Sequence, residues 1–202
     1  EGYYVPGMNN IMITNSDFNV NSGGGEGIYS YSDAQIRNYT IKNNTFNINT
    51  SSWAYGIDIE GYGGTSNTLV EGNTFKIGGG NGSGTGIYLE YLDSNNIVRN
   101  NTIDTLGTHS YMSEGMYLDG EYQTAPSGLV VENNIINNAY YGMNLEYGLS
   151  GINILNNTIT NTASTGGYGI YMYDVKAGDL NIKGNKFLNT DEYYGLYMED
   201  VK

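Results

Sequence analysis

A six-residue phrase recurs seven times along the chain and constrains its fold more than any other feature. In each copy a hydrophobic residue is followed two positions later by Asn or Gly, and three positions after that by Phe or Ile. The copies begin at Ile13, Ile41, Val70, Val98, Val131, Ile154 and Ile182. The first and last copies are 169 residues apart over six intervals, so the mean period is about 28 residues, which is typical of stacked-repeat architectures.

A second phrase alternates with the first, in which Gly is followed by a hydrophobic residue, any residue and usually another hydrophobic residue. Its copies begin at Gly27, Gly56, Gly86, Gly115, Gly142, Gly169 and Gly195. Alternation with a period of two predicts a β-strand whose first and third residues after the Gly point inward. The hydrophobic residues of both phrases would then form continuous files inside a stack of coils.

Strands joined by Gly-, Ser-, Thr- and Asn-rich bends, with one coil per repeat, predict an all-β fold. We expect a right-handed single-stranded parallel β-helix (a solenoid) of about seven coils of about 28 residues each. Residues 1–202 would form a single domain, without terminal caps.

Five copies of the first phrase carry Asn at the same position, namely Asn15, Asn43, Asn100, Asn133 and Asn156, and the other two carry Gly72 and Gly184. Asn and Gly tolerate a left-handed backbone best, so this position predicts a sharp bend. Stacked Asn side chains can also hydrogen-bond to one another along the stack. We therefore expect an Asn ladder at this bend.

Composition excludes several kinds of partner and site. The formal net charge is −13, which predicts repulsion of nucleic acids and of anionic membrane surfaces. The chain has no Cys, and its one His, His109, lies in a polar loop, so thiolate and multi-His metal sites are excluded. No apolar run is long enough for a transmembrane helix, so membrane insertion is not expected.

The outward positions of the Gly strand form the candidate site, because one file is rich in Tyr and the next is rich in carboxylates. The candidate residues for a glycan- or cation-binding face are Tyr88, Tyr117, Glu60, Glu90, Asp119 and Glu146. Like charges stacked about 4.8 Å apart repel, so bound cations, a basic partner or neighbouring loops should balance them. A face of this kind is expected to be flat.

Three alternatives remain for this face. It can be a solvated exterior in which Tyr serves as a good strand former. It can bind Ca²⁺ through Glu60, Glu90 and Asp119, or it can supply the paired acids of a glycosidase, although any stacked acidic file meets that spacing. By contrast, the neighbouring file Lys42, Glu71, Arg99 and Glu132 alternates in sign and predicts ordinary cross-strand ion pairs.

The Asn position at the bend, the Gly strand and the Asn-Asn-Thr-Phe/Ile phrase together resemble the right-handed parallel β-helix repeat proteins of the pectin-lyase-like superfamily. The composition is similar to that of archaeal and bacterial surface and adhesin-like proteins. The superfamily includes polysaccharide lyases, glycosidases, phage tailspikes and non-catalytic stalks, so fold alone does not choose a function.

The resemblance implies a cell-surface or extracellular location. We expect a non-catalytic structural or adhesin-like solenoid without a cofactor, in which coils stack head to tail on a second copy or on adjoining repeats of a longer chain. The alternatives are a carbohydrate-binding module, or a polysaccharide lyase or glycosidase that uses the Tyr and acidic files.

Overall fold

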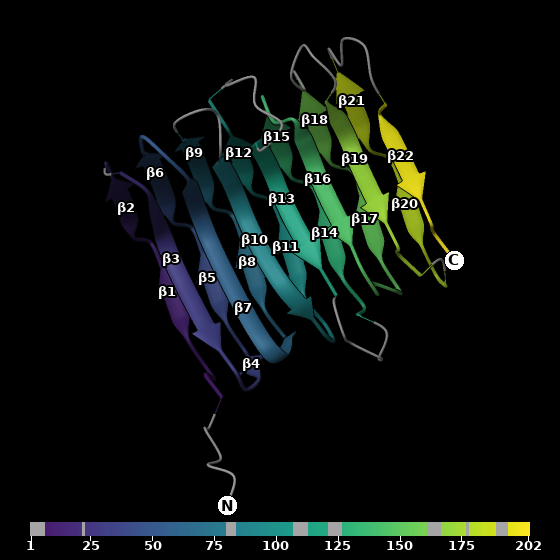
Figure 1. Ribbon diagram of the computed structural model, residues 1–202, viewed down its shortest axis with the longest axis horizontal. Helices are drawn as coiled ribbons and strands as arrows, with labels where there is room; N and C mark the ends of the chain where they lie inside the picture. The colour runs from purple at the N-terminus through teal and green to yellow at the C-terminus, as the bar shows by residue number, and fades with distance from the viewer. Residues whose placement is uncertain are drawn as a thin grey trace, which may run out of the picture.

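The chain winds as a solenoid of short β-strands. The computed structural model describes residues 7–21, 23–79, 84–106, 113–120, 127–160, 167–176, 178–188 and 194–202. Its strand pairs are parallel. The colour changes steadily from purple to yellow along the long axis in Figure 1, so each coil lies beside the one before it in sequence. The predicted loop at His109 lies outside the described residues.

The described strands form three sheets that run the length of the solenoid, which makes about six full turns. The first sheet contains β1 (Met12–Thr14), β5 (Thr40–Lys42), β8 (Leu69–Glu71), β11 (Ile97–Arg99), β14 (Val130–Glu132), β17 (Asn153–Leu155) and β20 (Asn181–Lys183). The second contains β2 (Asp17–Val20), β6 (Thr45–Asn49), β9 (Thr74–Gly78), β12 (Thr102–Asp104), β15 (Ile135–Asn137), β18 (Thr158–Thr160) and β21 (Lys186–Leu188). The third contains β3 (Gly25–Ser32), β7 (Ala54–Ser66), β10 (Gly84–Leu92), β13 (Ser113–Asp119), β16 (Tyr141–Glu146), β19 (Tyr168–Tyr173) and β22 (Leu196–Glu199), with the short β4 (Ile36–Arg37) beside β7.

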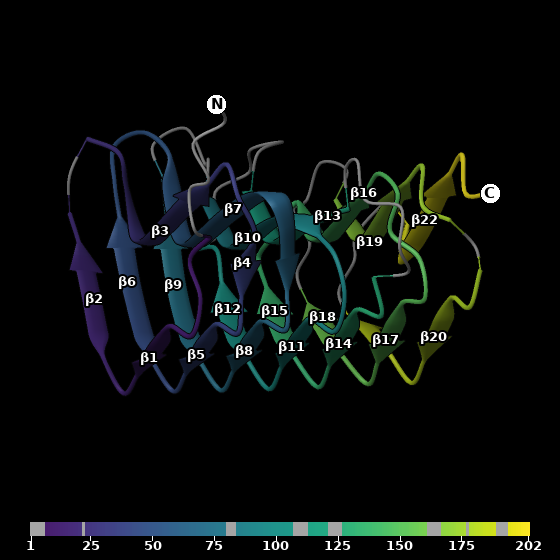
Figure 2. The same ribbon diagram turned by 90° about the horizontal axis from the view of Figure 1, so that it is seen from below.

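The predicted bend divides the six-residue phrase into two strands, one in the first sheet and one in the second. All seven residues of the predicted file have positive φ angles, with values of 52° at Asn15, 56° at Asn43 and 67° at Gly72. These bends form the row of V-shaped corners in Figure 2. A second left-handed row, which we did not predict, precedes the first sheet and includes Asn38, with φ of 57°, and Asn67, with φ of 52°.

The hydrogen-bonded Asn ladder lies one residue further along the chain than predicted. Its members are Asn44, Asn73, Asn101, Asn134, Asn157 and Asn185. The side-chain oxygen of Asn101 accepts hydrogen bonds from the backbone and side-chain nitrogens of Asn73, at 2.9 and 3.0 Å. Asn43 and Asn100, by contrast, are exposed at the bend. The prediction was therefore right about the conformation of the first Asn but wrong about which Asn makes the ladder.

Apolar files fill the interior as predicted. Ile57 and Ile87 from the third sheet and Val70 from the first are fully buried. The rings of Phe18, Phe46 and Phe75 from the second sheet stack with centroids 4.8 and 4.6 Å apart. The core is therefore continuous between coils, and the side chains of one file pack on the same file in the next coil.

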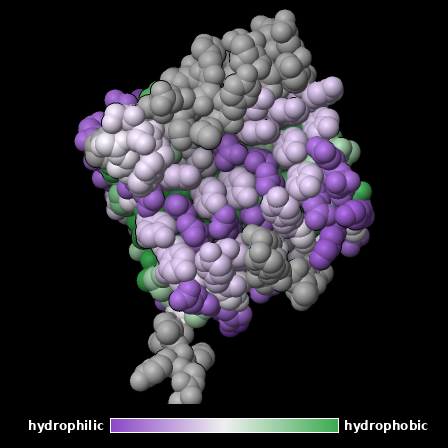
Figure 3. Space-filling view, viewed as in Figure 1, coloured by the Kyte–Doolittle hydropathy of each residue, from purple (hydrophilic) through white to green (hydrophobic). Residues whose placement is uncertain are grey.

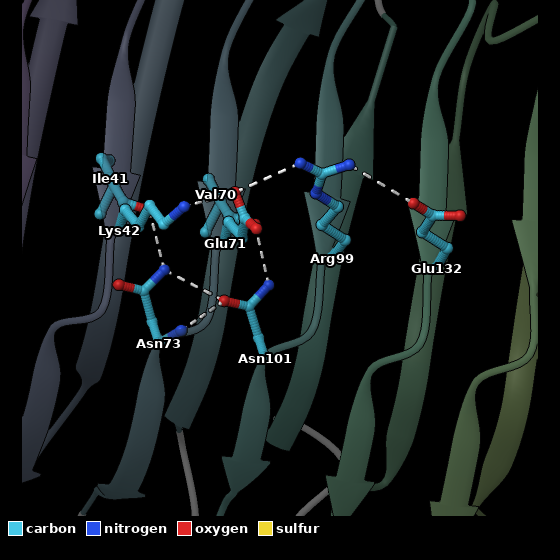
Figure 4. Close-up of polar contacts among 8 residues, drawn as sticks. All are labelled: Ile41, Lys42, Val70, Glu71, Asn73, Arg99, Asn101 and Glu132. Atoms are coloured by element: carbon cyan, nitrogen blue, oxygen red, sulfur yellow. Dashed lines mark hydrogen bonds and ion pairs between the residues drawn. The ribbon is translucent and has the colours of Figure 1, made fainter.

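The charge ladder on the first sheet is also confirmed (Figure 4). Lys42 Nζ lies 3.3 Å from Glu71 Oε2, and Arg99 lies 3.4 Å from Glu71 and 3.8 Å from Glu132. The two cations lower the pKa of Glu71 against the opposing effect of burial. This sheet balances its own charges, as expected for opposite charges on neighbouring strands.

Candidate functional site

The outer face of the third sheet carries three files of polar and aromatic residues, which we call the Tyr/carboxylate face. The first predicted file contains Tyr29, Asp58, Tyr88, Tyr117, Asn144, Tyr171 and Tyr197. The second contains Tyr31, Glu60, Glu90, Asp119, Glu146, Tyr173 and Glu199. Figure 3 shows this side of the molecule as a mixture of strongly hydrophilic and paler residues.

The structure brings the six predicted site residues together on neighbouring strands. The rings of Tyr88 and Tyr117 stack with centroids 4.7 Å apart and planes 11° from parallel. Glu60 is in register with Glu90, and Asp119 is in register with Glu146. The predicted files are therefore correct.

The carboxylates of this face receive hydrogen bonds from the tyrosines beside them. The Tyr88 hydroxyl donates to Glu90, and the Tyr117 hydroxyl donates to Asp119 at 3.1 Å and to Glu146 at 3.4 Å. Burial and the neighbouring carboxylates raise the pKa of both phenols, so they remain protonated donors. Hydrogen bonds from these tyrosines thus supply part of the stabilisation of the stacked carboxylates that we expected from cations or a partner.

Sequence reasoning missed a third file, which lies one residue before each Gly and contains Glu26, Tyr55, Thr85, Glu114, Tyr141 and Tyr168. Strict alternation across the Gly would place these residues inside. The glycines break that alternation, because a Cβ added at Gly86 would point into the core, 2.6 Å from Ile103 Cγ2. The glycine file is therefore the signal that could have located these residues.

Glu114 is the most buried acid of this third file. The side-chain amide of Asn144 donates to Glu114 at 2.9 Å and to Glu146 at 3.0 Å. Burial raises the pKa of Glu114 to about 7, and the charge of Glu146 adds to the effect, while the hydrogen bonds from Asn144 and Thr85 oppose it. Burial likewise raises the pKa of Asp58 to about 8, with the charges of Glu60, Glu26 and Glu90 contributing in the same direction. Both acids are neutral over part of the ordinary pH range.

These shifts predict that the protein is more stable at pH 5 than at pH 8.5. Folded Asp58 and Glu114 hold protons that the unfolded chain releases near pH 4, so their stabilisation is complete below that pH. It is lost as pH rises to about 7 for Glu114 and about 8 for Asp58. After allowance for partial solvent screening, we expect a loss of about 3 kcal/mol in the free energy of unfolding.

Urea unfolding at the two pH values measures this difference. The Asp58→Asn/Glu114→Gln double variant should flatten the pH dependence, and Asp33→Asn, which alters an exposed carboxylate, should preserve it. An equal slope in the wild type and the double variant would contradict the assignment.

The face is not uniformly flat, and this corrects the expectation from sequence. Glu26, Tyr29, Trp53, Tyr55, Asp58 and Glu60 line a shallow depression of about 420 Å³ over β3 and β7. Of the six predicted site residues, only Glu60 lines it. Within the described ranges, no group of three or more His, Asp or Glu side chains converges closely enough to hold a metal ion. Glu60, Glu90 and Asp119 are therefore not drawn together into such a group in this structure.

Comparisons with known proteins bear on the family alone. The model of a right-handed β-helix region matches residues 1–187. No curated protein and no solved structure matched the chain. In the part of the chain that the structure describes, no helix is long and apolar enough to span a membrane. The repeat period, the three parallel sheets and the matched residues agree, and the chain belongs to the right-handed β-helix family.

Proposed function

We propose that this chain is a non-catalytic, extracellular structural solenoid, a stalk or adhesin-like element that extends by stacking further coils on its ends. The observation that carries the proposal is the continuity of the same supporting contacts from coil to coil. The Asn ladder runs from Asn44 to Asn185, buried except at its last member, and all three sheets accompany it. Such a rod keeps its cross-section while its length changes, which suits a spacer.

The arrangement of the carboxylates supports a structural role for the Tyr/carboxylate face. The same pairing of a Tyr with the acid two residues later occurs in successive coils, at Tyr88 with Glu90 and at Tyr117 with Asp119. A catalytic pair would be expected at one place with its own environment, whereas a repeated pair matches the repeat of the fold.

The end surfaces support stacking. Leu196 is 36% exposed and Met198 is 50% exposed, whereas Ile170 and Met172 occupy the same files one coil earlier and are fully buried. Because the strands are parallel, the two ends differ, and a further coil fits only head to tail. That coil can come from adjoining repeats or from a second copy, through a contact that propagates without closing.

Sedimentation velocity and electron microscopy over a range of protein concentrations test the proposal. We expect end-to-end oligomers that lengthen with concentration, and Met198→Glu should disperse them. Asn181→Glu, which adds the same charge to an exposed outer position of the last coil, should leave them intact. Monomers at every concentration, or equal loss in both variants, would contradict stacking between copies.

A further inference from the structure

The depression over β3 and β7 exists because Asp58 replaces a ring in an otherwise mostly aromatic file. In that file Asp58 lies between Tyr29 and Tyr88 on the neighbouring strands. A carboxylate is much smaller than a phenol, so a space remains where the other coils place a ring or an amide. The volume of about 420 Å³ is open to solvent on one side and is lined by six residues.

Three aromatic residues, Tyr29, Trp53 and Tyr55, line this space. The Trp53 ring lies against the backbone of Gly24, where an added Cβ would be 2.7 Å from the indole nitrogen. Its centroid is 5.9 Å from that of Tyr55, and the two planes are tilted by 52°. Trp53 is 42% exposed and Tyr29 is 56% exposed, so both rings are accessible to a ligand.

Three carboxylate residues also line this space. Asp58 is 5% exposed, and its Oδ1 atom is buried without a hydrogen-bond partner. A buried carboxyl oxygen without a hydrogen-bond partner is costly, so this atom points to a ligand that donates a hydrogen bond to it once the acid is ionised. Glu26 and Glu60 line the same space. The ion pairs found among the described residues lie elsewhere, at Lys42–Glu71–Arg99–Glu132 and at Asp174–Lys202.

We propose that this depression binds a primary alkylammonium group, such as an aliphatic amine or a lysine side chain. Trp and Tyr ring faces attract a cation, an ammonium N–H can donate to Asp58 Oδ1, and Glu26 and Glu60 add negative charge in the same space. A quaternary ammonium has no donor for Asp58 Oδ1. A neutral sugar can donate hydrogen bonds but leaves the charge of the carboxylates unbalanced. The described side chains also lack the convergence that a metal ion requires.

Binding should be coupled to loss of a proton from Asp58. The groups that face this carboxyl are Glu26 and Tyr29 on β3, Tyr55 and Glu60 on β7, and Tyr88 and Glu90 on β10. Burial, together with the charges of Glu60, Glu26 and Glu90, keeps the carboxyl of Asp58 protonated at neutral pH, and an incoming cation opposes both effects. We therefore expect about tenfold tighter binding at pH 8.5 than at pH 6.5, with the amine itself still charged at both.

Fluorescence of Trp53, the single Trp of the chain, follows the binding directly. Titration with n-butylammonium at pH 8.5 should change the emission saturably. Asp58→Asn should weaken binding about tenfold and remove the pH dependence, because the pair with a charged oxygen is lost. Asp58→Tyr, which fills the space as in the neighbouring coils, should abolish binding. Glu199→Gln, at the far end of the face, is the matched control and should bind as the wild type does.

Further probes distinguish the chemistry and the source of the amine. Tetramethylammonium and methyl glucoside should bind at least tenfold more weakly than n-butylammonium. A 1,4-diaminobutane affinity well above that of N-acetyl-lysine amide would assign the site to polyamines, and equal affinities would assign it to lysine side chains. Equal binding of n-butylammonium by wild type and Asp58→Asn, or tighter binding of the sugar or of tetramethylammonium, would overturn the proposal. Because Trp53 lies in the second coil, the change in its fluorescence on amine binding is independent of end-to-end stacking.

Discussion

Replacing Asn101 by Ala should lower the free energy of unfolding by about 3–5 kcal/mol, although no apolar contact of the core is removed. The side-chain oxygen of Asn101 accepts two hydrogen bonds from Asn73. Its side-chain nitrogen donates to the Val70 carbonyl and to the Asn134 side chain, both at 3.0 Å. The side chain thus connects its coil to the coils on both sides.

The expected loss is large because the groups left behind are buried. Asn73 is 1% exposed and Asn134 is fully buried, so water has poor access to the donors and acceptors that lose their partner. A buried polar group left unsatisfied costs about 1–3 kcal/mol, and the truncation affects several. Against a typical total stability of about 5–15 kcal/mol, this change places the fold close to its limit.

The neighbouring residue provides the matched control. Asn100 is exposed and has a φ of 56°, and two other coils have Gly at this position. Asn100→Gly should therefore change the stability by less than about 1 kcal/mol. Urea unfolding followed by circular dichroism compares the two variants. Similar losses for Asn100→Gly and Asn101→Ala would show that the buried ladder has no special role.

The Gly86→Ala variant should be destabilised by about 3 kcal/mol, because the added methyl group has no room. Its Cβ would lie 2.6 Å from Ile103 Cγ2 and 2.7 Å from the carbonyl oxygen of Gly115 in the next coil. The carbonyl is part of the backbone and cannot rotate away, so the coils would have to separate. The same hypothetical collision with the next coil's glycine recurs at Gly56 and Gly142.

Gly178→Ala is the appropriate comparison, since an added Cβ there meets no atom within 4 Å. Thermal unfolding should show a clear decrease in midpoint for Gly86→Ala and almost none for Gly178→Ala. A Gly86→Ala protein as stable as the wild type would mean that neighbouring coils can move apart more easily than their close contacts suggest.

The architecture could be predicted from sequence because the repeat gives the same answer seven times. The period fixes the coil length, and the positive φ at Asn43 and Gly72 follows from the residues that tolerate it. Cross-strand files such as Tyr88 beside Tyr117, and Arg99 between Glu71 and Glu132, follow from the register alone. A structural feature that recurs in every repeat can be assigned in one coil and then transferred to the others.

Two features could not be derived in the same way. Both adjacent positions of the phrase carry Asn in most copies, and it is the three-dimensional turn that leaves Asn100 exposed and Asn101 buried. The depression arises from an exception to the repeat, because Asp58 occupies a position where five of the other six coils have Tyr. Averaging over repeats emphasises shared features and hides such a single departure.

The backbone contacts of each coil reach about one repeat along the sequence, as with Thr102 N bonded to Asn73 O and Ile135 N bonded to Asn101 O. Cooperativity then passes only between neighbours, and in the isolated 202-residue chain, without stacked partners, the first and last coils have a neighbour on one side only. Amide hydrogens should exchange with solvent fastest near β1 and β22 and slowest near β11, in a graded profile in place of a single global value. Unfolding of that isolated chain would begin in its first and last coils and proceed inward, so the outer coils would be lost before the central coils unfold.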